Sequence, residues 1–198
     1  MSDDQIFRTA LLIIMSVALP IGIYHRVRSQ ATREPLDRMQ EGLFILIAVR
    51  LSGLVVWLGV VSFLIKPASM AWSSLPLPLG LRWTGVGVCA LAAVLMLWTM
   101  HRLGKNLTDT VVTRREHTLV TQGPYRWVRH PFYDCAAMFV TGIALLAANW
   151  FILATGAFAI GVLVNRTRIE EEKLLARFGD PYRAYLARTG RFLPKLGA

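Results

Sequence analysis

Long runs without charged residues constrain this chain more than any other feature. Such runs cover residues 9–24, 42–65, 79–100 and 135–165, interrupted only by Arg50 in the second run and Arg82 in the third. About 20 consecutive apolar residues cross the hydrocarbon core of a bilayer as a helix. The chain is 55% hydrophobic and only 17% charged, whereas a soluble domain carries about 25% charged residues. We therefore expect an all-α, polytopic membrane protein embedded in a lipid bilayer.

The fourth run is too long for one ordinary span. Asn149 and Trp150 lie near its middle, and they pair a polar residue with an aromatic residue typical of the membrane interface. We interpret the run as two spans joined by a tight turn. The predicted total is then five transmembrane helices, of which the last two form a hairpin.

The positions of the basic residues test this number independently. Eighteen of the 22 Lys and Arg residues fall within residues 25–41, 101–134 and 166–198. Lys and Arg accumulate in cytoplasmic loops, and these three segments share one side only if there are five spans. The N-terminus is then outside and the C-terminus cytosolic, in a bacterial inner membrane or an ER-like membrane. This topology explains the net charge of +10 through attraction to anionic headgroups, so we expect no nucleic-acid partner.

The chain divides near Met100 into two regions. Residues 1–100 hold the first three predicted helices with short loops and few residues suited to chemistry. Residues 101–198 hold a long cytosolic loop, the hairpin and the C-terminal helices. This second region contains the candidates for a catalytic region.

One polar cluster follows the last apolar run. Arg166 and Glu170 are four residues apart, so they share a face if the span continues as a helix, and Glu171 comes next. A carboxylate there could bind an ammonium group, and the arginine could bind a carboxylate bidentately. From spacing alone, an ordinary surface ion pair beside snorkelling basic side chains is the simpler interpretation.

A second cluster is Arg129-His130-Pro131, with Tyr125 and Tyr133 on either side. The residue before a proline avoids the helical region, which predicts a break at His130. A histidine, aromatic rings and freed backbone groups suit a nucleotide pocket, but they also suit a belt of residues at the membrane interface.

Two other patterns are discounted. The histidines form no H-x-x-x-H or H-E-x-x-H pattern, so we expect no metal site: His25, His101, His117 and His130. Residues 85–90 formally fit G-x-G-x-x-A, but a dinucleotide-binding fingerprint follows a strand. Here it lies inside an apolar run, where small residues more often allow helices to pack closely.

A series of short motifs runs through the second region. In order, these are H-T-L-V at 117–120, G-P-Y at 123–125, R-H-P-F-Y at 129–133, the charge-free hairpin, R-x-x-x-E-E at 166–171 and F-G-x-x-Y at 178–182. The series resembles the isoprenylcysteine carboxyl methyltransferase family of integral membrane enzymes and, more distantly, the phospholipid N-methyltransferases. The resemblance covers about half of the chain. Each motif is weak alone, but their order and spacing are specific.

The resemblance implies methyl transfer from S-adenosylmethionine (SAM), bound at the cytosolic side, to a lipophilic methyl acceptor that is most simply a carboxylate. It implies that the donor pocket is lined by one set of residues: His117, Thr118, Leu119, Val120, Gly123, Tyr125, Arg129, His130, Pro131, Phe132 and Tyr133. It also implies that Glu170 holds the donor and that Arg166 faces the acceptor. Glu171 and His130 are the candidate bases for an amine or thiol acceptor.

One departure leaves the acceptor open. The loop before His117 is shorter than in the eukaryotic prenylcysteine enzymes, so a carboxylate, an amine and a thiol all remain candidates. Two further hypotheses also stay open. The chain could be an NADPH-dependent reductase of the sterol-reductase type, which has a similar C-terminal arrangement, or a non-enzymatic membrane subunit whose charged motifs form an interface.

Overall fold

The computed structural model describes residues 3–30, 43–104 and 118–195. These residues form six α-helices and two short 3-10 helices, without a strand: α1 (Asp3–Gln30), α2 (Leu43–Ile65), η2 (Pro67–Ser73), α3 (Leu79–Leu103), η4 (Gly123–Arg126), α4 (Pro131–Ala147), α5 (Trp150–Phe178) and α6 (Asp180–Arg188). The expected all-α class is confirmed for this part of the chain. His117 lies outside the described residues.

Four of the described helices are long and apolar enough to cross a membrane: α1, α2, α3 and α5. They identify an integral membrane protein. The apolar helix α4 has 17 residues, about 25 Å at 1.5 Å per residue, which is slightly less than a hydrocarbon core of about 30 Å. A fifth span therefore remains a prediction. The expected helix after residue 165 continues the last apolar run without a break, which gives α5 its 29 residues.

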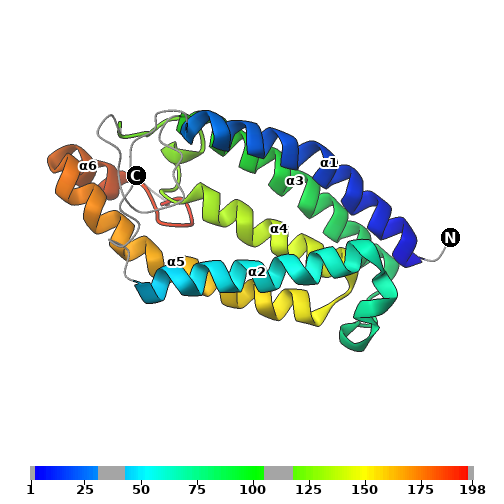
Figure 1. Ribbon diagram of the computed structural model, residues 1–198. Helices are drawn as coiled ribbons and strands as arrows, with labels where there is room; N and C mark the ends of the chain where they lie inside the picture. Colours follow the sequence, from blue (N-terminus) through cyan, green and yellow to red (C-terminus); the bar gives the residue numbers. More distant parts are fainter. Residues whose placement is uncertain (1–2, 31–42, 105–117, 196–198) are drawn as a thin grey trace.

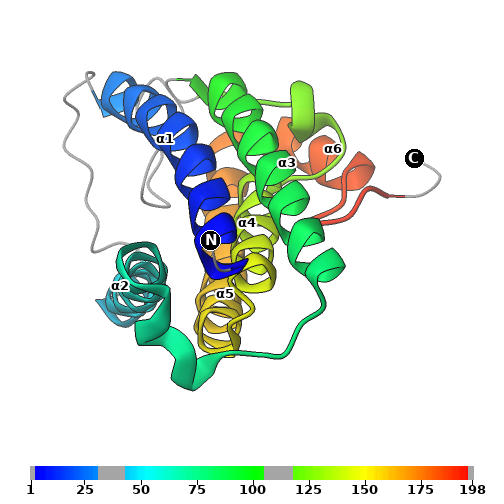
Figure 2. The same ribbon diagram turned by 90° about the vertical axis from the view of Figure 1, so that its right-hand side faces the viewer.

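The helices run back and forth in one bundle, so that successive helix ends alternate between its two ends (Figure 1). The start of α1, the connection from α2 to α3 and the turn from α4 to α5 lie at one end, which we call the hairpin end. The end of α3, the start of α4 and all of α6 lie at the other, which we call the α6 end. Figure 2 shows α2 standing apart from α1 and beside α5.

The turn between α4 and α5 confirms the predicted hairpin. Asn149 is buried, and its side-chain oxygen accepts a hydrogen bond from the backbone N–H of Ile152 at 3.0 Å, which caps the start of α5. Its amide nitrogen donates to Ser73 Oγ at 2.7 Å. The turn is thereby tied to the connection that leads into α3.

Arg82 occupies the first turn of α3 but is buried rather than exposed to solvent. Its Nε donates to the carbonyl oxygen of Leu146 at 2.9 Å, and its Nη2 lies 2.8 Å from Asp4 Oδ1. The last carbonyls of a helix have no partner within the helix. Arg82 therefore supplies a hydrogen-bond donor to a carbonyl at the end of α4, and it also binds Asp4 at the start of α1.

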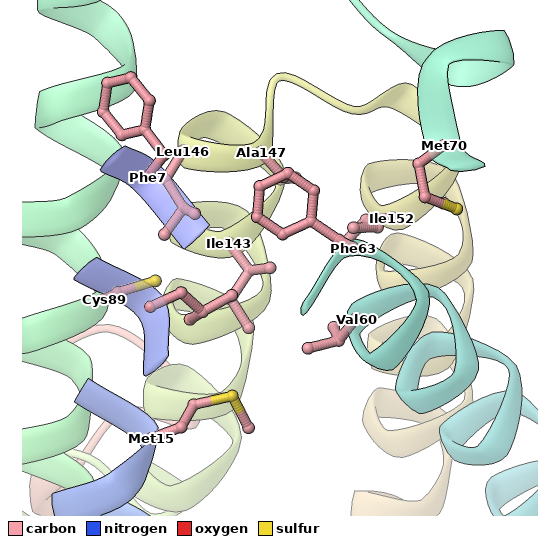
Figure 3. Close-up of a cluster of buried hydrophobic side chains, with 12 residues drawn as sticks. Phe7, Met15, Val60, Phe63, Met70, Cys89, Ile143, Leu146, Ala147 and Ile152 are labelled. Carbon is pink, nitrogen blue, oxygen red and sulfur yellow. The ribbon is translucent and has the colours of Figure 1, made fainter. Parts of the chain in front are cut away.

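The buried apolar core lies toward the hairpin end (Figure 3). On α1, the core residues come from the first half of the helix: Phe7, Leu11 and Met15. On α2, they come from the second half: Val60 and Phe63. The remaining halves of both helices, nearer the α6 end, expose large apolar side chains: Val17, Ile21, Ile23 and Val27 on α1, and Leu43, Phe44, Ile47 and Leu51 on α2. Lipid tails are as apolar as these side chains, so a bilayer can cover them.

Helices α3 and α4 approach closely at two glycines. A Cβ atom on Gly85 would lie 2.6 Å from the backbone nitrogen of Leu146, and one on Gly142 would lie 2.8 Å from the backbone nitrogen of Cys89. The interpretation of the G-x-G-x-x-A string as a helix-packing feature is thus confirmed for Gly85. A Cβ atom on Gly87 would meet nothing within 4 Å.

We expect Gly85→Ala to destabilise the protein by about 1–3 kcal/mol, because overpacking against a fixed backbone has that cost. Gly87→Ala is the matched control on the same helix and should leave stability unchanged or slightly raised, since alanine is the better helix former. Thermal unfolding of both variants in detergent measures the difference. Equal unfolding temperatures would contradict the close packing of α3 against α4.

Candidate active site

The start of α4 is set by His130-Pro131. His130 adopts φ −123° and ψ 53°, outside the helical region, and α4 begins at Pro131, a position where the missing N–H of proline is not needed. The predicted break is thus confirmed. The backbone before it pairs with the end of the chain: Arg129 N–H donates to the carbonyl of Gly190 at 2.9 Å, and His130 N–H donates to that of Arg191 at 3.1 Å.

The two polar clusters predicted from the sequence meet at the α6 end. The Tyr133 hydroxyl donates to Glu170 Oε2 at 2.9 Å, and His130 Nε2 lies 3.1 Å from Glu171 Oε1. His130 Nδ1 lies 3.8 Å from Glu170 Oε2. The start of α4 and the end of α5 therefore form one polar site at the end of an apolar bundle.

Glu171 is the most heavily bonded residue described in this site. Its Oε1 lies 2.8 Å from Arg129 Nε, 3.1 Å from His130 Nε2 and 3.2 Å from Arg191 Nε. Its Oε2 accepts from Arg191 Nη2. These contacts are charge-assisted, and they occupy both carboxylate oxygens. The hydrogen bond to Glu171 also raises the pKa of Arg191.

Glu170 and Arg166 are placed differently. The Glu170 side chain is 31% exposed, and the Tyr133 hydroxyl and His130 both contact the same oxygen, Oε2. Arg166 lies one helical turn earlier on the same face of α5 and is buried. The partly exposed Glu170 carboxylate and the buried Arg166 guanidinium thus share one face of α5. The carboxylate suits an ammonium group, and the guanidinium suits an anion.

Two tyrosines of α6 approach the site from the other side. Tyr185 is buried, its hydroxyl donates to the carbonyl of Tyr125 at 2.7 Å, and burial raises its pKa to about 12. Tyr182 is also buried, and its hydroxyl has no hydrogen-bond partner among the described residues. Burial, with Glu171 close by, raises the pKa of Tyr182. Buried hydroxyls normally have a partner, so this oxygen is available to a ligand atom or a water.

The other expected pocket residues lie in or near the same region. Gly123 has φ +65°, and a Cβ atom there would lie 2.8 Å from Arg102 Cγ, so this turn requires glycine. The remaining members differ in burial: Tyr125 and Pro131 are buried, Leu119, Val120 and Phe132 are half-buried, and Thr118 is exposed. The role of the residues before Gly123 in the polar site stays a prediction.

The sequence did not indicate that the end of the chain contributes to this site. Thr189 offers its carbonyl to Arg129, Arg191 binds Glu171, and the Phe192 ring lies 5.9 Å from that of His130. The available signal was the T-G-R-F string after the last helix. Arg191 was instead counted with the basic residues that mark a cytosolic segment.

Comparison with known proteins supports one family. The model of the isoprenylcysteine carboxyl methyltransferase (ICMT) family matches residues 85–177, just under half of the chain. The chain is therefore similar to this family over that stretch. The ICMT resemblance that was expected from the motifs is thus confirmed.

Among the curated proteins similar to this chain, the cobalt-zinc-cadmium resistance protein CzcN of Cupriavidus metallidurans is 28% identical over 149 residues, which cover 71% of this chain and 63% of that protein. The protein-S-isoprenylcysteine O-methyltransferase of Saccharomyces cerevisiae is 33% identical over 98 residues, which cover 48% of this chain and 41% of that enzyme. The chain therefore spans less than two thirds of each relative.

A solved structure has the same fold. It is described as the eukaryotic intramembrane Ras methyltransferase ICMT, and it superimposes with a TM-score of 0.54 at 24% identity, covering 91% of this chain and 66% of that one. At this level of identity, the likeness establishes a shared membrane-helix fold.

Replacing Glu171 should destabilise the α6 end. We expect Glu171→Ala to cost about 3–5 kcal/mol, because it leaves Arg129 and His130 buried without the carboxylate that binds them. Asp180→Ala is the control, since Asp180 is exposed and pairs with the exposed Arg183 at 3.0 Å, and such pairs contribute little. Chemical unfolding in detergent compares the two, and equal stability would contradict a central role for Glu171.

Proposed function

We propose that this protein is an integral membrane methyltransferase that transfers a methyl group from SAM to a lipophilic acceptor, most simply a carboxylate as in the ICMT enzymes. One observation carries the proposal: the R-H-P-F-Y segment and the R-x-x-x-E-E helix meet at the end of an apolar bundle, through the Tyr133–Glu170 and His130–Glu171 contacts. The similarity of residues 85–177 to the ICMT family supports the same activity.

The residues present fit the donor. SAM supplies a methyl group on a positively charged sulfur. Glu170 is exposed enough to accept hydrogen bonds from the donor's ammonium group, and Tyr133 orients it from one side. The Tyr182 hydroxyl is a buried polar atom that needs a partner, and Leu119 and Val120 offer apolar surface beside the motif. We propose that the donor lies among these side chains.

Arg166 is the proposed acceptor-binding residue. Its position on the same face of α5 as Glu170, one turn closer to the apolar part of the helix, suits a carboxylate at the end of a lipophilic chain. A carboxylate is ionised at neutral pH, so such an acceptor needs no general base. Glu171 is the weaker candidate for a base, because Arg129, His130 and Arg191 surround it.

The apolar side chains that α1 and α2 expose along their length also support a lipophilic acceptor, because this apolar surface continues to the α6 end where the site is found. We further propose that all five long apolar segments cross the membrane, with residues 101–198 as the catalytic region. The N-terminus is then outside and the site cytosolic. The membrane is a bacterial inner membrane or an ER-like membrane.

The metal-resistance name of CzcN does not favour a second function here. Within the described residues, no group of three or more His, Cys, Asp or Glu side chains could hold a metal ion. A resistance protein can act through a modified lipid or protein as well as through a bound metal. The methyltransferase proposal is therefore compatible with that name.

We expect Arg166→Ala to abolish methyl transfer to a carboxylate acceptor while leaving the binding of S-adenosylhomocysteine (SAH) within about twofold of the wild type. The guanidinium orients the acceptor by a bidentate pair, and positioning of two reactants supplies much of the rate. Transfer from labelled SAM to a panel of carboxylate, amine and thiol lipids measures the first effect, and calorimetry measures the second. Lost SAH binding with unchanged transfer per bound donor would contradict this role.

Calorimetry with SAH and with NADPH in parallel separates the proposal from the reductase hypothesis. We expect SAH to bind with a Kd in the micromolar range, which corresponds to a binding free energy of about −8 kcal/mol. We expect no binding of NADPH. Binding of NADPH alone would favour the reductase, and binding of neither ligand would favour a non-enzymatic subunit.

A further inference from the structure

The last seven described residues form a segment fixed at both ends, which we call the strap (residues 189–195). Thr189 is fully buried at its start, and Lys195 Nζ donates to two carbonyls at the end of α6, at 2.8 and 2.9 Å. Between them, a Cβ atom on Gly190 would lie 1.6 Å from the carbonyl oxygen of Leu193, so this turn requires glycine. The backbone of the strap also pairs with the segment before α4. These contacts hold the backbone of the strap in place, and none of them involves the side chain of Arg191.

Arg191 projects from the strap onto Glu171. Its Nε lies 3.2 Å from Oε1 and its Nη2 binds Oε2, so one guanidinium contacts both carboxylate oxygens. Paired N–H donors of this kind fix the orientation of a carboxylate as well as its position. Without Arg191, Glu171 would keep Arg129 and His130 on Oε1, but no described contact would hold Oε2.

The orientation of Glu171 matters because a series of contacts continues from it to Glu170. The His130 ring is in contact with Glu171 and stacks on the Tyr133 ring, with 5.5 Å between centroids and 3° between planes. Tyr133 in turn donates to Glu170 at 2.9 Å. Phe192, the next residue of the strap, lies 5.9 Å from the same histidine ring.

We propose that Arg191 is a positioning residue of the donor site, which holds the Glu171 carboxylate and thereby the His130 and Tyr133 rings that orient Glu170. The inference rests on the proposed function, in which Glu170 binds the donor. Arg191 touches none of the proposed reacting groups. Its loss is therefore expected to weaken donor binding, with little effect on the rate at saturating donor.

Calorimetric titration of the full-length protein in detergent with SAH tests the inference without requiring the acceptor. We expect Arg191→Ala to raise the Kd about tenfold, the size expected for one lost hydrogen bond to a charged group. Arg191→Lys keeps the positive charge but lacks the two parallel N–H donors of the guanidinium. Its affinity for SAH should therefore lie between those of Arg191→Ala and the wild type. Arg183→Ala is the control, and it should leave the Kd unchanged because this exposed guanidinium pairs with Asp180, not with Glu171, and does not hold the strap.

Combination with Glu171→Leu distinguishes a positioning role from other roles, because leucine has no oxygen to accept a hydrogen bond from Arg191. If Arg191 acts through Glu171, adding Arg191→Ala to Glu171→Leu should change the SAH Kd no further. A second tenfold loss would mean that Arg191 acts on the donor directly or on the fold as a whole, and would overturn the inference. An unchanged Kd in Arg191→Ala alone would also overturn it, with the proposed function intact. If the wild-type protein binds no SAH, both proposals fail together.

Discussion

The α6 end of this protein depends on one carboxylate. Glu171 is 11% exposed, and a buried charge is tolerated only when it is paired and hydrogen-bonded. Its partners come from the segment before α4 and from the end of the chain, which are far apart in sequence. The pairing requirement therefore brings three segments to one point at the end of an otherwise apolar bundle. The neighbouring Glu170 has fewer contacts and is more exposed, so it is free to take part in binding.

The sequence predicted the parts of the fold that depend on simple patterns. Uninterrupted hydrophobicity located the long helices, and the polar Asn149 inside an apolar run marked the hairpin, because a buried amide must find partners. The proline after His130 marked the start of α4. The order of the motifs gave the resemblance to the ICMT family, although the spacing of Arg166 and Glu170 alone favoured a surface ion pair.

The contribution of the strap could not be predicted in the same way. Arg191 is one of many basic residues near the C-terminus, and composition does not distinguish a guanidinium that binds Glu171 from one that faces lipid headgroups. Its role depends on a backbone pairing between residues about 60 positions apart, which no local pattern encodes. The burial of Arg82 was equally hidden, since an arginine at the start of a span normally snorkels to the interface. Here it binds the end of α4 instead.

The hairpin fixed by Asn149 has a consequence for the geometry of the site. At 1.5 Å per residue, Tyr133 lies about 24 Å from the turn along α4, and Glu170 lies about 31 Å from it along α5. The two side chains nevertheless meet. The number of residues between the turn and each side chain therefore determines whether the pair can form. One residue inserted into either helix would turn every later side chain by about 100° and separate the pair. A single-residue insertion in either helix of the hairpin is therefore expected to disrupt the site more than the exchange of one apolar residue for another.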